Sequence, residues 1–129
     1  IQLTTVESNR KKSLFIDYIV RKLKLEKVKI LNCRAEELAI RKEYQNKFDF
    51  AFFRAVSSDI RNCIEVASKI LKKTDVVSTK AIFWASKQSI SKFDYLSSCY
   101  KVLKPHFEYV LPGNRLRYLV LIDFSRKPS

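Results

Sequence analysis

Charged side chains follow three β-rich, apolar runs in this sequence. Glu7, Glu36 and Arg54 each come after such a run; the runs span residues 1–6, 28–31 and 48–53. In open α/β sheets, ligands bind beyond the carboxyl ends of the strands. Carboxylates at that edge can accept hydrogen bonds from hydroxyl groups, and a guanidinium can hold a phosphate or a base. We therefore expect the three side chains to share a nucleoside ligand.

Glu7 directly follows the first run. An acidic residue at a strand tip can accept hydrogen bonds from both ribose hydroxyls of a nucleoside cofactor. A solvated carboxylate near the positive end of the following helix explains the same residue. Glu7 alone does not separate the two interpretations.

Ala35 and Glu36 follow the second run. A small residue here lets a flat adenine approach the backbone, and the next acidic side chain can meet its polar edges. An ordinary helix start is the alternative, because the helix dipole favours acidic side chains in the first turn.

Arg54 ends a run that otherwise predicts a strand covered on both faces. A guanidinium in such a place must be paired or must reach a ligand. The cofactor, a phosphate or a base are candidate ligands, and an ion pair with a carboxylate such as Glu36 is the structural alternative.

Further cations lie near the same predicted edge. Lys80 is expected late in the strand Val76–Ile82, where it points into a cleft or into solvent. Arg10, Lys11 and Lys12 form a cluster just after the first run and suit phosphates, although a solvated helix start also explains them.

The periodicity of apolar residues predicts alternating strands and helices. Strands are expected at 1–6, 28–31, 48–53, 75–83, 107–111 and 117–124, and helices at 11–24, 34–42, 60–73 and 89–104. Candidate helix caps are Ser8 or Asn9 for the first helix, and Ser57, Ser58 and Asp59 for the third. Such alternation favours an α/β fold with a parallel sheet between helices, closed by an antiparallel hairpin through Pro112, Gly113 and Asn114.

The amino-acid composition limits the kinds of molecule that this chain could bind. The 129 residues carry a formal net charge of +13, which favours a polyanion, nucleic acid before membrane; biased amino-acid usage is the alternative. Three widely spaced cysteines and one histidine, His106, argue against a disulfide framework and a metal site, so we expect reduced, partly buried thiols. No run is long enough to cross a bilayer. We expect a cytoplasmic monomer.

Several short motifs together resemble one family, the 16S ribosomal RNA guanine-N7 methyltransferases, also called glucose-inhibited division protein B. The resemblance covers essentially the whole chain. The motifs are Val6-Glu7-Ser8 with Lys11-Lys12, Arg34-Ala35-Glu36, Phe48-Asp49 with Arg54-Ala55-Val56, Lys80, and Arg117 opening the last strand. Arg54-Ala55-Val56 is the most distinctive. The glutamate at Glu7, often aspartate in the family, and Phe83-Trp84 after Lys80 depart from the pattern.

The resemblance implies a class I, Rossmann-like methyltransferase fold that uses S-adenosylmethionine (SAM) and acts on 16S ribosomal RNA or the small ribosomal subunit. It implies cofactor contacts from Glu7, Ala35, Glu36 and Arg54. Arg54 and Lys80 would line the methyl-transfer cleft. RNA contacts would come from the basic residues Arg10, Lys11, Lys12 and Arg117. A non-catalytic basic α/β RNA-binding module is the alternative function.

The chain contains one glycine, Gly113, so a Gly-rich cofactor loop is absent from it. In a doubly wound fold that loop precedes an acidic residue placed like Glu7. We therefore expect residues 1–129 to be the C-terminal portion of a single methyltransferase domain, with the loop and a first strand upstream of Ile1.

Overall fold

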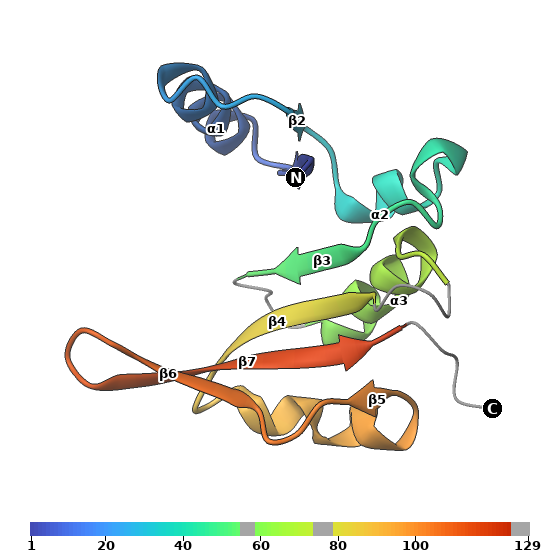
Figure 1. Ribbon diagram of the computed structural model, residues 1–129, viewed down its shortest axis with the longest axis vertical. Helices are drawn as coiled ribbons and strands as arrows, with labels where there is room; N and C mark the ends of the chain where they lie inside the picture. The colour runs from blue at the N-terminus through green and yellow to red at the C-terminus, as the bar shows by residue number, and fades with distance from the viewer. Residues whose placement is uncertain (55–58, 74–78, 125–129) are drawn as a thin grey trace. The chain divides into compact units, whose positions relative to one another are not determined.

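The computed structural model describes residues 1–54, 59–73 and 79–124 (Figure 1). The chain divides into two compact units, residues 1–42 and 43–129. The predicted motif residues Ala55 and Val56, the candidate caps Ser57 and Ser58, and most of the segment preceding Lys80 lie outside the described residues.

The first unit is a two-stranded parallel sheet with helices. It contains β1 (Leu3–Val6), α1 (Arg10–Lys22), β2 (Val28–Leu31) and α2 (Ala35–Ala39). The register pairs Leu3 with Val28 and Val6 with Leu31. Both carboxyl ends therefore lie at one edge of this small sheet, as the alternating pattern predicted.

Helix α1 leaves part of its apolar surface open. Asn9 caps the helix by accepting a hydrogen bond from the Lys12 backbone N–H at 3.1 Å, which confirms one of the two predicted caps. Leu14, Phe15 and Tyr18 are more than half exposed. Two short strands are too small to cover a helix that carries apolar residues around so much of its circumference.

The second unit begins with the short 3₁₀ helix η1 (Lys42–Tyr44) at the boundary and is built on a five-stranded mixed sheet. Its strands are β3 (Phe50–Phe53), β4 (Lys80–Ser86), β5 (Lys101–Val102), β6 (Phe107–Leu111) and β7 (Arg115–Asp123). The order is β3-β4-β7-β5, with β6 also pairing with β7. Strands β3 and β4 are parallel, and every pair that involves β7 is antiparallel. The predicted hairpin is thus confirmed, and positive φ angles of 82° and 57° at Gly113 and Asn114 form its turn.

One face of this sheet forms the core. Cross-strand register places the buried residues Ala51, Ala81 and Ile122 in one row, and the half-buried Phe53 with the buried Phe83 and Val120 in the next. Helix α3 (Ile60–Ile70) and the 3₁₀ helix η2 (Ile90–Ser98) supply further buried side chains, including Ile64, Ala67, Phe93 and Leu96. The Phe83 and Phe93 ring centroids lie 5.4 Å apart. The two helices therefore cover the same face.

The opposite face of the sheet is open within the described part of this unit. Phe50 and Phe52 on β3 are 50% and 59% exposed, and Trp84 on β4 is 37% exposed. The prediction that β3 is covered on both faces is therefore wrong for the described residues. An unbroken apolar run predicts burial on both faces. Here the outward side chains of Phe52 and Trp84 contact each other, with ring centroids 5.7 Å apart, and remain partly exposed.

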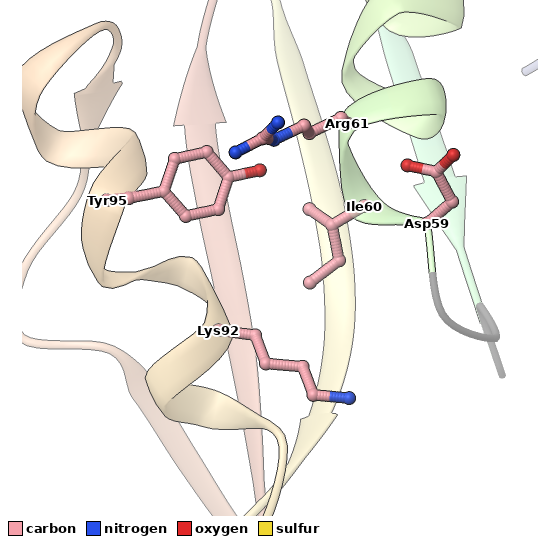
Figure 2. A pocket seen from close by; sticks show the side chains of 5 residues that line it. All are labelled: Asp59, Ile60, Arg61, Lys92 and Tyr95. Atoms are coloured by element: carbon pink, nitrogen blue, oxygen red, sulfur yellow. The ribbon is translucent and has the colours of Figure 1, made fainter.

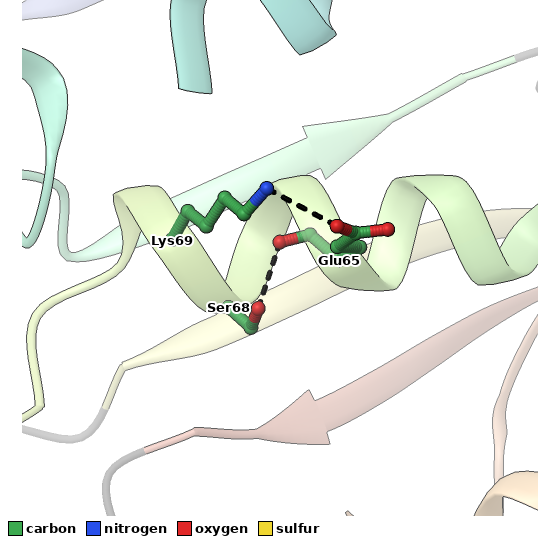
Figure 3. A network of polar contacts seen from close by, with 3 residues as sticks. All are labelled: Glu65, Ser68 and Lys69. Atoms are coloured by element: carbon green, nitrogen blue, oxygen red, sulfur yellow. Dashed lines mark hydrogen bonds and ion pairs between the residues drawn. The ribbon is translucent and has the colours of Figure 1, made fainter. Parts of the chain in front are cut away.

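The helix predicted at 60–73 corresponds to α3, which ends three residues earlier, at Ile70. Asp59 Oδ1 accepts a hydrogen bond from the Asn62 backbone N–H at 3.1 Å, so the predicted cap is confirmed. On the outer surface Lys69 Nζ lies 3.1 Å from Glu65 Oε1, and Ser68 Oγ donates to the Glu65 carbonyl (Figure 3). These exposed contacts orient the polar face, while Ile64, Ala67 and Ile70 point to the core.

The long helix predicted at 89–104 is wrong. The structure has η2 over Ile90–Ser98, followed by β5 at Lys101–Val102. Val102 pairs with Ile122 of β7, so residues whose spacing predicted a helix form a strand instead. Ser97 and Ser98 favour helix ends over helix interiors, which helps the chain to leave the helix there.

Candidate functional site

Glu7 lies at the carboxyl tip of β1 and is fixed by backbone contacts. Its N–H donates to the Leu31 carbonyl at 3.0 Å, and its Oε1 accepts from the Asn9 N–H at 2.9 Å. Asn32 Nδ2 donates to the carbonyl oxygens of Glu7 and Ser8, at 2.8 and 3.1 Å. Asn32 was not singled out from the sequence, although an amide just after a strand is a known turn signal. The strand tip therefore presents a half-buried carboxylate in a defined turn.

Ala35 and Glu36 open α2, the short helix after β2. Arg34 is the N-cap residue and makes no side-chain capping bond, while Glu36 and Glu37 occupy the first turn. Ala35 is half-buried and Glu36 is exposed. The predicted short helix with acids in its first turn is confirmed, and these residues come from the same edge of the first unit as Glu7.

Arg10, Lys11 and Lys12 form the first turn of α1, and all three are exposed. No acidic side chain accompanies them in that turn. Cations are disfavoured at the positive end of a helix dipole, at about 0.3–1 kcal/mol each when exposed. Helix stability therefore does not account for this cluster, whereas an anionic partner would.

Arg54 lies immediately after β3 and is exposed. Within the described residues of its own unit it forms no ion pair. Its neighbouring strand β4 is parallel, with Phe53 paired to Phe83, so the carboxyl ends of both strands meet at the same edge. The guanidinium is thus presented at a strand tip, as expected.

Lys80 is placed differently from the prediction. It is the first residue of β4, paired with Phe50 and with Asp123, so the expectation that it lies late in its strand is wrong. The earlier part of the predicted strand, including Val76 and Val77, lies outside the described residues. Lys80 lies toward the amino end of β4 and Arg54 beyond the carboxyl end of β3.

Lys87 is the lysine that follows the carboxyl end of β4, and it is exposed. Next to it Ser86 and Ser89 close a tight turn, in which the Ser86 N–H donates to Ser89 Oγ at 2.8 Å. Sequence reasoning missed Lys87; the turn-forming serines after the strand were the available signal.

Arg117 belongs to the same edge of the second unit. Strand β7 opens at Arg115 rather than at Arg117, and Arg117 pairs with Ser86, the last residue of β4. Because β7 is antiparallel to β4, its beginning lies at the carboxyl end of β4. Arg54, Lys87 and Arg117 therefore come from three adjacent strands at one edge, which we call the cationic edge.

The described residues show neither a metal-binding cluster nor a membrane-spanning helix. In residues 1–54, 59–73 and 79–124 no three His, Cys, Asp or Glu side chains gather as a metal site would require. Cys33 and Cys63 are half-buried, and Cys99 is exposed, contrary to the expectation of partial burial. None of the described helices combines the length and apolar character that spanning a bilayer requires.

Comparison with solved structures identifies the fold. The structure matches an rRNA methylase from Streptococcus thermophilus with a TM-score of 0.69 and 8% identity, over 97% of this chain and 74% of that one. It matches the O-methyltransferase from Bacillus cereus, solved in complex with SAH, with a TM-score of 0.68 and 17% identity, over 95% of this chain and 62% of that one. The fold is therefore that of the class I methyltransferases, as predicted.

Comparison with known sequences identifies the family. The "Ribosomal RNA small subunit methyltransferase G" of Oenococcus oeni is 31% identical over 128 residues, 95% of this chain and 50% of that protein. The protein of the same name from Mycoplasma capricolum is 53% identical over 57 residues, 44% of this chain and 23% of that protein. The chain thus spans half or less of the lengths of these relatives. The family model for rRNA small subunit methyltransferase G matches residues 1–106. The chain belongs to the rRNA small subunit methyltransferase G family.

Proposed function

We propose that the protein carrying this chain transfers a methyl group from SAM to guanine N7 of 16S ribosomal RNA, and that the chain is part of a single methyltransferase domain. The observation that carries the proposal is the family match over residues 1–106. The placement of polar residues at strand tips supports it, since ligands of α/β sheets bind at that edge.

Glu7, Ala35 and Glu36 are assigned to the nucleoside part of SAM. The Glu7 carboxylate suits ribose hydroxyls because it lies at a strand tip and is oriented by the Asn9 N–H. Ala35 leaves room for a flat base near the backbone at the start of α2. When bound, SAM supplies an electrophilic methyl group on a sulfonium sulfur.

Arg54, Lys87 and Arg117 of the cationic edge are assigned to the target nucleotide, and the resemblance assigns Arg54 a cofactor contact as well. The resemblance placed Lys80 in the methyl-transfer cleft. We do not assign it to the cleft, because it opens β4 and so lies at the end of that strand opposite to Lys87. Guanine N7 carries an in-plane lone pair, so the reaction needs no general base. The protein side chains hold and align the base and its phosphates rather than remove a proton.

Isothermal titration calorimetry with SAM tests this proposal. We expect the protein to bind SAM, and Glu7→Gln to weaken binding about tenfold, because a charge-assisted hydrogen bond contributes roughly 1.5–3 kcal/mol. Glu26→Gln, which changes an exposed glutamate after α1, is the matched control and should bind as the parent does. Binding of RNA with no detectable binding of SAM would instead support a non-catalytic RNA-binding module.

Charge reversal at the start of α1 is expected to weaken RNA binding and, at the same time, to stabilise the fold. Lys11→Glu with Lys12→Glu should weaken binding to a ribosomal RNA fragment by tenfold or more at physiological salt, since at least two phosphate contacts would be lost. The same change should raise the free energy of unfolding by about 0.5–2 kcal/mol, because acids favour a helix N-terminus.

Fluorescence anisotropy and urea unfolding measure the two effects. The control is Lys22→Glu with Arg21→Glu at the other end of α1, which changes the net charge equally but should lower stability. Equal losses of RNA affinity in both double variants would show that only net charge matters and would remove the specific role of Lys11 and Lys12.

A further inference from the structure

An open pocket lies between α3 and η2 in the second unit. It is lined by Asp59, Ile60 and Arg61 at the start of α3 and by Lys92 and Tyr95 on η2, with a volume of about 300 Å³. Figure 2 shows the side chains of Arg61, Lys92 and Tyr95 reaching from the two helices toward this space, with Ile60 between them. Of these residues, only Asp59 was singled out from the sequence, and then only as a helix cap.

The conformation of η2 brings two of the lining residues together. Lys92 and Tyr95 are three positions apart in a 3₁₀ helix, where residues i and i+3 lie directly above one another. Phe93 and Leu96, offset by one position, form the corresponding row that is buried in the core. The outward row is therefore held in place by the inward one.

Arg61 of α3 and Tyr95 of η2 contact each other across the pocket. The Arg61 guanidinium carbon lies 5.5 Å from the Tyr95 ring centroid, a cation–π contact. The ring remains accessible, because Tyr95 is 42% exposed. A guanidinium and an aromatic ring are the two side-chain types on which unpaired nucleic-acid bases stack.

The charges of the pocket favour an anion. Arg61 and Lys92 supply two cations, and Asp59 is the only carboxylate among the lining residues. That carboxylate is engaged in capping α3 through the Asn62 N–H. A base at the Arg61–Tyr95 contact would therefore leave its phosphate within the field of two cations.

We propose that this pocket binds a single-stranded RNA nucleotide that flanks the target guanine; the identification of the RNA rests on the proposed function. Asp59 lies five positions after Arg54, so the chain keeps the pocket within at most about 18 Å of the cationic edge. A strand of RNA whose target base is at Arg54 can therefore place a neighbouring nucleotide here. An acidic peptide would use the same cations but not the stacking surface.

Binding of a fluorescent single-stranded RNA of about 10 nucleotides, containing one 2-aminopurine, tests the proposal. The measurement is made without SAM, so it is independent of whether the protein binds SAM or transfers a methyl group. We expect the parent chain to quench 2-aminopurine through stacking. Tyr95→Ala should lose the quenching and weaken binding roughly 5- to 100-fold, and Tyr95→Phe should retain both because it keeps the ring.

The salt dependence of RNA binding distinguishes the phosphate contact of Lys92 from base stacking on Tyr95. Lys92→Ala should reduce the slope of log affinity against log salt by about 0.7, the value for one phosphate contact on a single strand. Lys101→Ala, which removes an exposed lysine on β5, is the matched control and should leave the slope unchanged. Tyr95→Ala should also leave the slope unchanged.

Three results would overturn the proposal. The first is equal affinity and quenching in the parent and Tyr95→Ala. The second is an equal loss of slope in Lys92→Ala and Lys101→Ala, which would mean diffuse attraction rather than a site. The third is no binding of the RNA by the parent, and in that case SAM calorimetry still decides the methyltransferase proposal separately.

Discussion

Replacing Arg54 with alanine is expected to lower methyl transfer to ribosomal RNA on the order of 100-fold, in the protein that carries this chain. The exposed guanidinium follows β3 at the edge where β4 also ends, and no described carboxylate of its unit pairs with it. Its loss should therefore cost alignment of the target, and small misplacements of reacting atoms carry penalties of this size. Transfer of a tritiated methyl group to 16S RNA measures the rate.

The charge and the shape of Arg54 can be separated by a second variant. Arg54→Lys keeps the charge but loses the planar fork of donors, so it should recover only part of the rate. Arg41→Ala, which removes an exposed arginine that follows no strand, is the control and should keep the parent rate. Full activity of Arg54→Ala with an unchanged KM would remove Arg54 from the proposed cleft.

The elements that were predicted well carry local signals. Asn9 and Asp59 were expected as caps, and both accept the capping hydrogen bond. Val28–Leu31 is predicted with the bounds that the structure has, since polar residues flank a short apolar run. The hairpin turn was also predicted, because Gly113 and Asn114 tolerate positive φ angles.

The errors share one physical cause, which is pairing between distant residues. Val102 has the spacing of a helix residue, but its place is fixed by Ile122 of β7, twenty positions later in the chain. The start of β4 is likewise fixed by pairing of Lys80 with Phe50 and Asp123. Local periodicity contains no information about such partners.

In the candidate site, too, features with a local sequence signal were predicted, and features that depend on distant residues were not. Arg54 was predicted at the end of its strand, from its type and its place after an apolar run, and it lies there. Lys80 was predicted late in its strand but opens β4, and a shift of a few residues moves a side chain from one end of a strand to the other. The Arg61–Tyr95 contact could not be predicted, because it joins two helices through a ring and a guanidinium that lie 34 positions apart.

Replacing Phe83 with alanine is expected to lower the free energy of unfolding by about 3–5 kcal/mol. Phe83 is 1% exposed, and its ring lies 4.7 Å from that of Phe53 and 5.4 Å from that of Phe93. The substitution opens a cavity where β3, β4 and η2 meet. Because small domains have only about 5–15 kcal/mol of stability, urea unfolding followed by circular dichroism should show a much lower midpoint. Phe83→Leu should cost less and keeps the measurement possible if the alanine variant does not fold.

Trp84, the next residue along β4, provides the matched test of which sheet face is the core. Its side chain is larger than that of Phe83, yet it lies on the open face and contacts Phe52. Trp84→Ala should therefore cost only about 1–2 kcal/mol, from the lost ring contact and partial burial. A loss equal to that of Phe83→Ala would contradict the assignment of the face carrying Phe50, Phe52 and Trp84 as the open one. Since the two residues are adjacent and point to opposite faces, backbone effects are shared, and the difference between them reports the packing of the two faces directly.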